Sequence, residues 1–229
     1  MEYLHNGYTL ELSPDAFPLS TDSIALAHFV KLPKNARVLD LGSGCGTLGL
    51  YLCALDEGCT VCGLELSESA HKMALHNASA NNIPHRLNSV CGDVRNIPEI
   101  FPSGSFSCCV SNPPYFSSGP QSQKTPLARR EDCCSLSELF AAAGWALQYG
   151  GDFFIVHRPE RLAELCACGA QYKLEAKKLL LLRHRSDGPV SLILMQFRKG
   201  GKPGLIWQEE SLAAPDGSKT DYYRSLYHI

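Results

Sequence analysis

Short apolar runs alternate with longer amphipathic stretches along most of the chain, which is typical of an α/β protein. Helical patterns are expected at residues 23–30, 47–55, 67–82, 135–147 and 159–168. Seven runs predict strands, at residues 37–41, 60–64, 86–91, 106–111, 152–157, 173–183 and 190–197. This alternation predicts a mostly parallel sheet with helices on both faces. The last two strands have no helix between them, so we expect an antiparallel hairpin at one edge.

The chain of 229 residues is long enough for one domain with a substantial core. We expect an N-terminal arm and helix over residues 1–35, a core over 36–198 and a C-terminal tail over 199–229. Residues 1–12 lack the basic start and apolar centre of a secretory signal, and no apolar run approaches the roughly 18 residues of a membrane span. The sequence therefore predicts no contact with a membrane.

The 11 cysteines do not form a metal-binding pattern. Most lie inside apolar runs, where a free cysteine behaves as a small hydrophobic residue. The C-x-x-C at Cys59–Cys62 lies on a predicted strand and has no second pair to complete a zinc site. We therefore expect no metal. Reduced thiols without a secretory signal indicate the cytoplasm.

Charge is distributed unevenly along the chain. Residues 1–119 hold six Lys and Arg against eleven Asp and Glu, whereas residues 120–205 hold thirteen against eight. Residues 206–229 hold two against four. A basic second half is compatible with a docked polyanion, and a solvated basic face explains it equally well.

Residues suited to ligand binding recur where the predicted parallel strands end. Gly42, Glu65, Asp93 and Asn112 each follow one of four successive strands. Ligands of open α/β sheets bind at the carboxyl ends of the strands, so these four residues are expected to converge on one site.

The first three of these residues indicate an adenosine-containing cofactor. The glycines of residues 42–46 let the backbone pass close to a ligand, but Thr47 stands where a dinucleotide-binding motif requires glycine. Glu65 is placed to accept hydrogen bonds from both hydroxyls of a ribose, and Asp93 from an adenine amino group. Each residue alone could be an ordinary strand end; together they predict a cofactor with no pyrophosphate.

The stretch Asn112-Pro113-Pro114-Tyr115 is the second candidate for chemistry. The two prolines lack an N–H and restrict the backbone, so they hold Asn112 on a stiff turn at a strand end. An amide, a fixed carbonyl and an aromatic ring suit the binding of a planar group that carries an NH₂. The polar residues 117–132 then predict a loop, and whether it becomes ordered on substrate binding stays open.

These motifs resemble those of a known family. VLDLGSGCG, the acid at Glu65, the GDV of residues 92–94 and NPPY are similar to class I S-adenosylmethionine-dependent methyltransferases, which implies a Rossmann-like fold. NPPY resembles enzymes that methylate a nitrogen conjugated to a π-system. Three further stretches, PLSTDSIALAHF, LARREDCCSLSELFAAAGWALQYGGDFFIVHRPERL and RKGGKPGL, resemble the bacterial tRNA (valine) adenine-N6-methyltransferase family.

The resemblance implies S-adenosyl-L-methionine as cofactor and tRNA as substrate, and it assigns residues to three roles. The catalytic residues would be Asn112, Pro113, Pro114 and Tyr115. The cofactor would contact Thr21, Asp40, Gly42, Ser43, Gly44, Glu65, Leu66, Asp93, Val94 and Asn112. The RNA would contact Phe116, Arg130, His157, Arg158, Lys199 and Lys202. The basic residues among these could equally be ordinary surface charges that contact only solvent.

Several alternatives remain at this stage. Glutamine methylation of a release factor shares NPPY, but those enzymes carry a helical domain ahead of the catalytic one, and about 36 residues precede the first strand here. Methylation of adenine in rRNA or DNA would use the same core. An RNA-binding protein without activity would not need an intact Asn112, and a nicotinamide oxidoreductase is disfavoured by Thr47. The oligomeric state, the tRNA and the nucleotide position are not predicted.

Overall fold

The computed structural model describes residues 2–4, 7–12, 20–114 and 134–228. Its main sheet has eight strands in the order β10-β8-β9-β7-β6-β3-β4-β5. The strands are β3 (Arg37–Leu41), β4 (Thr60–Glu65), β5 (Leu87–Cys91), β6 (Phe106–Ser111), β7 (Leu147–His157), β8 (Leu174–Arg185), β9 (Val190–Lys199) and β10 (Ile206–Ala213). Strands β3 to β7 pair in parallel, whereas β9 runs antiparallel to both β7 and β8.

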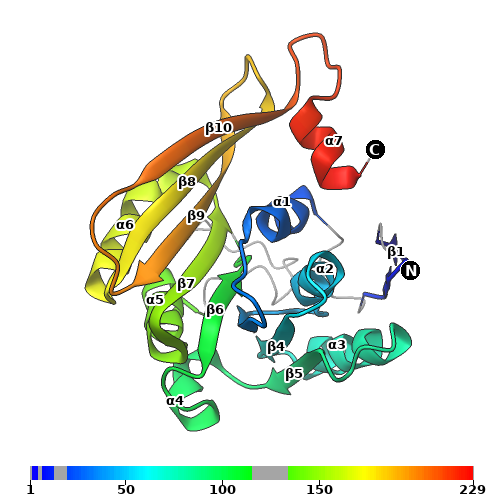
Figure 1. Cartoon of the computed structure of the whole chain (residues 1–229), viewed down its shortest axis with the longest axis vertical. Coiled ribbons are helices and arrows are strands. Elements are labelled where there is room, and N and C mark those ends of the chain that lie inside the picture. Colours follow the sequence, from blue (N-terminus) through cyan, green and yellow to red (C-terminus); the bar gives the residue numbers. More distant parts are fainter. Residues whose placement is uncertain (1, 5–6, 13–19, 115–133, 229) are drawn as a thin grey trace, which may run out of the picture.

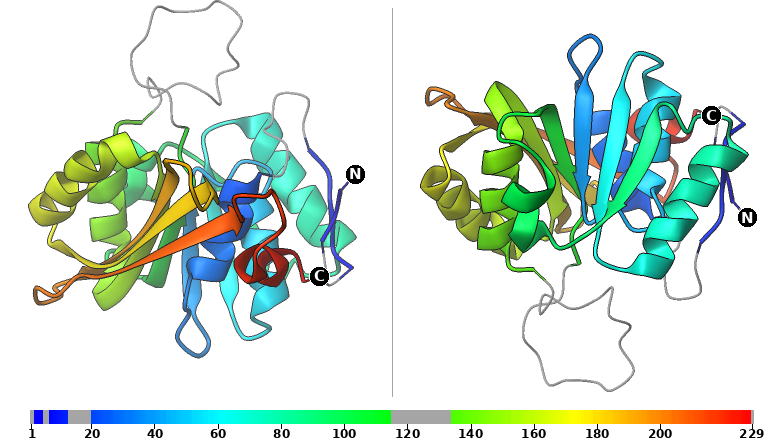
Figure 2. Two further views of the ribbon diagram at one scale, coloured as in Figure 1. Left: turned by 90° about the horizontal axis from the view of Figure 1, so that it is seen from above. Right: turned by 90° about the horizontal axis from the view of Figure 1, so that it is seen from below.

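Helices cover both faces of this sheet (Figures 1 and 2). One face is covered by α1 (Thr21–Phe29), α2 (Thr47–Leu55), α3 (Glu68–Ala80) and α7 (Asp221–Tyr227), the other by α4 (Ile97–Ile100), α5 (Leu136–Ala146) and α6 (Leu162–Gln171). Successive strand residues point to opposite faces, so neighbours such as Phe153 and Phe154 belong to different core clusters. The predicted α/β fold with a mostly parallel, Rossmann-like sheet is confirmed.

The predicted number of strands was wrong. We expected seven strands with the hairpin at the edge, but β10 continues the sheet beyond β8, and Ile206 pairs in parallel with Lys178. An edge strand is held mainly by its backbone ladder and needs no apolar alternation; the first five residues of β10 are exposed. The predicted tail thus holds a strand and a helix.

Two asparagine side chains hold the N-terminal arm against α3. The arm includes a small sheet of β1 (Glu2–Tyr3) and β2 (Thr9–Leu10). Asn81 bonds both the N–H and the carbonyl of Thr9 at 2.7 Å, as a neighbouring strand would. Asn77, one helical turn earlier, does the same with Glu11 at 2.9 and 2.8 Å. Asn77 also donates to the carbonyl of Cys45 at 2.9 Å, so it connects the arm with the glycine-rich turn after β3.

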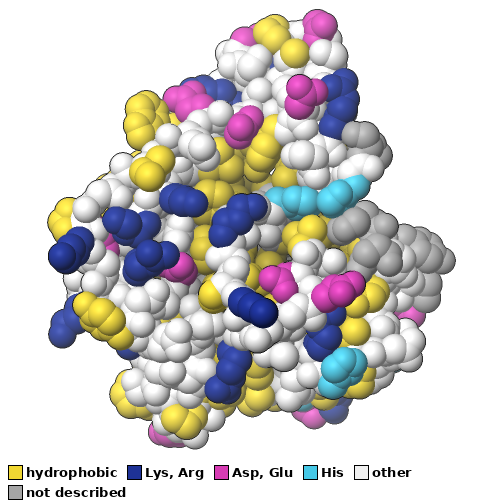
Figure 3. Space-filling view, in the orientation of Figure 1, with side chains coloured by type: hydrophobic (Ala, Val, Ile, Leu, Met, Phe, Trp, Pro, Cys, Tyr) yellow, Lys and Arg dark blue, Asp and Glu magenta, His cyan; other side chains and the backbone are white. Residues whose placement is uncertain are grey.

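The topology places the ends of β3, β4, β6 and β7 at one edge of the sheet, here called the ligand edge. Strand β8 is parallel to β7, so it ends at this edge as well, and the antiparallel β9 begins there. In the space-filling view, Lys and Arg side chains gather mainly over the half of the molecule built from the C-terminal strands (Figure 3). On the face that this view shows, the basic side chains lie over the outer strands (Figure 3).

Candidate active site

The glycine-rich turn leaves β3 at the ligand edge in a conformation that glycine favours. Gly42, Gly44 and Gly46 have φ values of 74°, 55° and 80°, which side chains rarely adopt. A Cβ at Gly42 or Gly44 would meet no atom within 4 Å, so open space lies beside the backbone there. The turn fits a ligand that packs directly against main-chain atoms.

Glu65 connects the end of β4 with the glycine-rich turn. Its carboxylate accepts hydrogen bonds from the N–H of Gly44 and from the N–H of Ser67, both at 2.8 Å. A carboxylate has about four acceptor positions, so two backbone bonds leave capacity for hydroxyl donors. The structure orients Glu65 for the predicted ribose contact, and that contact stays a prediction.

Asp40 and Ser43 carry buried polar atoms that are unpartnered among the described residues, namely Asp40 Oδ2 and Ser43 Oγ. Burial, together with the charge of nearby Glu65, raises the pKa of Asp40 to about 7. The hydroxyl of Ser43 packs against Gly63, where a Cβ on the glycine would come too close to Oγ for any larger residue to fit. The unpartnered atoms and the open space at Gly42 fit a polar ligand such as the predicted cofactor.

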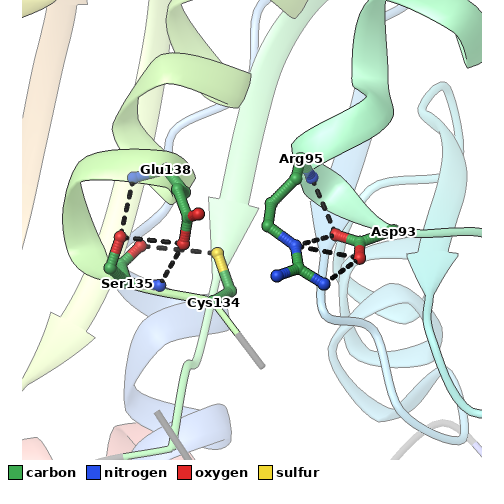
Figure 4. Close-up of polar contacts among 5 residues, drawn as sticks. All are labelled: Asp93, Arg95, Cys134, Ser135 and Glu138. Carbon is green, nitrogen blue, oxygen red and sulfur yellow. Dashed lines mark hydrogen bonds and ion pairs between the residues drawn. The ribbon is translucent and has the colours of Figure 1, made fainter. Parts of the chain in front are cut away.

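Asp93, the predicted adenine contact, forms an ion pair with Arg95. Arg95 Nε lies 2.9 Å from Asp93 Oδ2 and 3.0 Å from Oδ1, and the Arg95 N–H donates to Oδ1 (Figure 4). The guanidinium of Arg95 holds the pKa of Asp93 below its usual value. Asp93 therefore reaches the ligand edge already paired, which the sequence did not indicate.

Ser135 begins α5 opposite this ion pair. Its hydroxyl and the carboxylate of Glu138 form a reciprocal N-terminal cap, which lies opposite Arg95 (Figure 4).

Leu66 and Val94 follow the two acidic residues. Leu66 is 47% exposed, so it offers an apolar surface at the end of β4. Val94 is half-buried and packs against the core on the face of the sheet that α5 and α6 cover.

Asn112 lies directly after β6, and two serines hold this strand end in place. Asn112 Nδ2 donates to the hydroxyl of Ser23 in α1 at 2.9 Å. The buried hydroxyl of Ser111 donates to the carbonyl of Leu41 at 2.8 Å, and Leu41 immediately precedes Gly42. The amide is thereby held beside the glycine-rich turn on a half-buried turn with Pro113 and Pro114. Neither serine was predicted, because their partners lie 89 and 70 positions away.

Thr21 begins α1, two residues before Ser23. Its hydroxyl is 3.0 Å from that of Tyr227 in α7, so it joins the start of α1 to the C-terminal helix. The contact between Thr21 and the cofactor stays a prediction.

The predicted RNA contacts are not gathered at one place. Arg158 is exposed and follows β7 at the ligand edge. His157 is only 1% exposed, and its Nδ1 accepts from the N–H of Arg158, so the prediction that it meets the RNA backbone is contradicted by its burial. Burial also lowers the pKa of His157 to about 4.

Lys199 ends β9, and Lys202 follows it, at the opposite edge of the sheet. Lys199 donates to the carbonyl of Leu147 at 2.7 Å, where β7 begins, and the Lys202 carbonyl accepts from Lys177. Leu147 pairs with Phe106 and Ile155 with Ser111, so this edge is about five strand residues, or roughly 17 Å, from the end of β6. The contacts of both lysines with the RNA stay predictions. Tyr115, Phe116 and Arg130 lie outside the described residues.

Comparison with known proteins identifies the family. The family model described as methyltransferase small domain matches residues 20–165. The chain belongs to this family. The predicted class I S-adenosylmethionine-dependent methyltransferase is confirmed, and its cofactor is S-adenosylmethionine. The nicotinamide oxidoreductase is thereby excluded.

Two curated relatives with the same name illustrate the similarity. A tRNA1(Val) (adenine(37)-N6)-methyltransferase of Aeromonas hydrophila subsp. hydrophila is 28% identical over 92% of this chain and 89% of the relative. Another, of Photobacterium profundum, is 26% identical over 78% of this chain and 76% of the relative. A solved structure from Agrobacterium tumefaciens, described as an O-methyltransferase, has a TM-score of 0.76 at 19% identity and covers 91% of this chain and 96% of that chain; it is similar in fold.

Within the described part of the chain, no helix is long and apolar enough to cross a bilayer. In the same residues, no three His, Cys, Asp or Glu side chains gather as a metal site would require. The expectation of a metal-free enzyme stays a prediction.

Proposed function

We propose that this methyltransferase transfers a methyl group from S-adenosylmethionine to the N6 amino group of an adenine in tRNA, near the anticodon. The observation that carries the proposal is the position of the Asn112 amide. It is bonded to Ser23 and lies beside the glycine-rich turn through the bond between Ser111 and Leu41. The names of the curated relatives support adenine and tRNA as the target.

The residues act on a poor nucleophile. The lone pair of an aromatic NH₂ is delocalised into the ring, so the amine must be oriented before it can react. The Asn112 side-chain oxygen and the Pro113 carbonyl each accept one N–H of the amine, which directs the lone pair toward the cofactor. When bound, S-adenosylmethionine supplies an electrophilic methyl group on a sulfonium. Orientation and electrostatic stabilisation of this kind contribute on the order of 10²–10³ in rate per group.

Residues at the ends of β3 and β4 would hold the cofactor. The backbone of the turn at Gly42 and Gly44 would pack against it, and the Glu65 carboxylate would accept hydrogen bonds from its ribose. Leu66 offers an apolar surface to the adenine ring. The target base must unstack from the adjacent bases to reach Asn112, and the free-energy cost of unstacking is lowest in a single-stranded loop. Tyr115 would stack on it. The cytoplasm, where tRNA resides, is the proposed location.

The decisive experiment is mass spectrometry of nucleosides. Unmodified tRNA is incubated with the enzyme and S-adenosylmethionine, digested and compared with a sample that lacks the enzyme. N6-methyladenosine is expected. Methylation of a release-factor glutamine, of rRNA or of DNA in parallel reactions, with none in tRNA, would replace the proposal, and no transfer to any substrate would favour an inactive RNA-binding protein.

A further inference from the structure

The ligand edge of the sheet continues past Asn112, away from the cofactor residues. Gly42 and Glu65 follow β3 and β4, and Asn112 follows β6. On the other side of β6 the sheet continues with β7, β9, β8 and β10. Because β8 ends and β9 begins at this same edge, side chains of four more strands line it.

A pocket of about 170 Å³ opens on this second half of the ligand edge. Its polar residues come from four places in the fold: Thr21 and Asp22 in the first turn of α1, Arg158 after β7, His184 near the end of β8 and Ser191 near the start of β9. Leu192 and Leu212, each only 6% exposed, form its apolar part.

The pocket and the catalytic amide share one turn of helix. Asp22 lines the pocket, and the next residue, Ser23, accepts the hydrogen bond from Asn112. The pocket therefore begins one residue from the contact that orients the amide, on the side of β6 opposite to the glycine-rich turn. A substrate whose reacting amine meets Asn112 has this pocket as its neighbour.

The chemistry of the lining favours a nucleobase. His184 and the guanidinium of Arg158 carry N–H donors, and Arg158 Nη1 donates to the carbonyl of Ser191 at 3.3 Å. The carboxylate of Asp22 accepts hydrogen bonds and repels an isolated phosphate. A base edge carries both donors and acceptors, and the flat faces of a base suit the apolar surface of Leu192 and Leu212. Single-stranded RNA is read through unstacked bases of this kind.

We propose that this pocket binds the base of the nucleotide next to the target adenine. The inference rests on the proposed function and adds a second point at which the enzyme recognises its RNA. It makes the neighbouring base a determinant of catalytic efficiency, and it makes Asp22 and His184 residues that recognise that base.

The test uses unmodified tRNA that carries an abasic ribose on the 5′ or the 3′ side of the adenosine that the enzyme methylates. With the unchanged enzyme, removal of the base on one side should lower kcat/KM about tenfold, the effect of about 1.4 kcal/mol. With Asp22→Asn or His184→Ala, kcat/KM for intact tRNA should fall about tenfold. For these variants, removal of the neighbouring base should lower kcat/KM little further.

His85→Ala is the matched control. His85 is exposed and lines a hollow at the opposite edge of the sheet, together with Arg37, so its removal should change neither substrate. Binding of S-adenosylmethionine should be unchanged in all three variants.

Three outcomes overturn the proposal. The first is that the unchanged enzyme methylates tRNA equally well when the base on either side of the adenosine is missing. The second is that both pocket variants lose as much kcat/KM on base removal as the unchanged enzyme does. In either case the pocket does not recognise a base, and the proposed function still stands. If no adenine is methylated, the proposed function fails and the pocket assignment with it.

Discussion

The side-chain nitrogen of Asn112 donates a hydrogen bond of 2.9 Å to the hydroxyl of Ser23, from which it is separated by 89 positions in the chain. The bond fixes which end of the amide faces α1, so the amide oxygen is presented on the other side. A catalytic acceptor is useful only if its direction is fixed before the substrate arrives. The buried Ser23 therefore acts as a positioning residue for Asn112.

Replacement of Ser23 should separate positioning from binding. Ser23→Ala removes the partner of Asn112 and should lower kcat about tenfold, the usual effect of one lost hydrogen bond, without changing the Kd of S-adenosylmethionine. Ser23→Thr keeps a hydroxyl and should recover most of the rate. A kcat unchanged in Ser23→Ala would show that the amide needs no such support.

Replacement of Asn112 itself should greatly slow the chemical step. Asn112→Ala removes one of the two proposed acceptors and should lower kcat by about 10²–10³. Cofactor affinity, measured by calorimetry, should stay within a few-fold, because the glycine-rich turn and Glu65 are intact. An active Asn112→Ala enzyme would refute the assigned role.

Glu65→Ala should weaken S-adenosylmethionine binding. The variant loses the proposed ribose acceptor and the bonds that Glu65 accepts from Gly44 and Ser67, so we expect an increase in Kd of more than about tenfold. Glu68→Ala is the control, because Glu68 is exposed and pairs only with Lys72 among the residues described. Equal affinities of the two variants would remove Glu65 from the ribose site.

Asp40 should make folding stability fall as the pH rises. Its pKa is about 7 in the folded protein and near 3.8 in the unfolded chain, so the folded state binds more protons between these values. Asp40→Asn removes this dependence. Its free energy of unfolding relative to the unchanged protein should increase by roughly 2–3 kcal/mol between pH 5 and pH 8. Urea denaturation at both pH values measures this, and a constant difference would contradict it.

Asn77 should couple the N-terminal arm to cofactor binding, because it bonds both Glu11 and the carbonyl of Cys45. Asn77→Ala leaves buried groups unpaired and should cost about 1–3 kcal/mol of stability as well as cofactor affinity. Asn81→Ala releases Thr9 but leaves the Cys45 contact, so its Kd for S-adenosylmethionine should be unchanged. If both variants bind the cofactor normally, the arm does not support the glycine-rich turn.

The strands near the site were predictable because their signals are local. The runs that became β3, β4 and β6 are short, apolar and followed by glycine or polar residues, and parallel pairing then brings Gly42, Glu65 and Asn112 to one edge. β10 escaped prediction because it is an edge strand held by backbone bonds to β8. His157 was misjudged because a charge pattern does not indicate whether a side chain is buried.

The sequence alone determined the class of the enzyme, its α/β sheet and the residues that end its parallel strands. These features follow from the spacing of apolar residues along the chain and from short motifs. Only the tertiary structure decided what each of these residues touches. Ser23 accepts a hydrogen bond from Asn112, and Arg95 forms an ion pair with Asp93. Asn77 bonds the turn at Cys45, and Asp22 and His184 line one pocket. Most of these contacts join polar side chains from distant parts of the chain, and a hydrogen bond across such a separation leaves no periodic trace in the sequence.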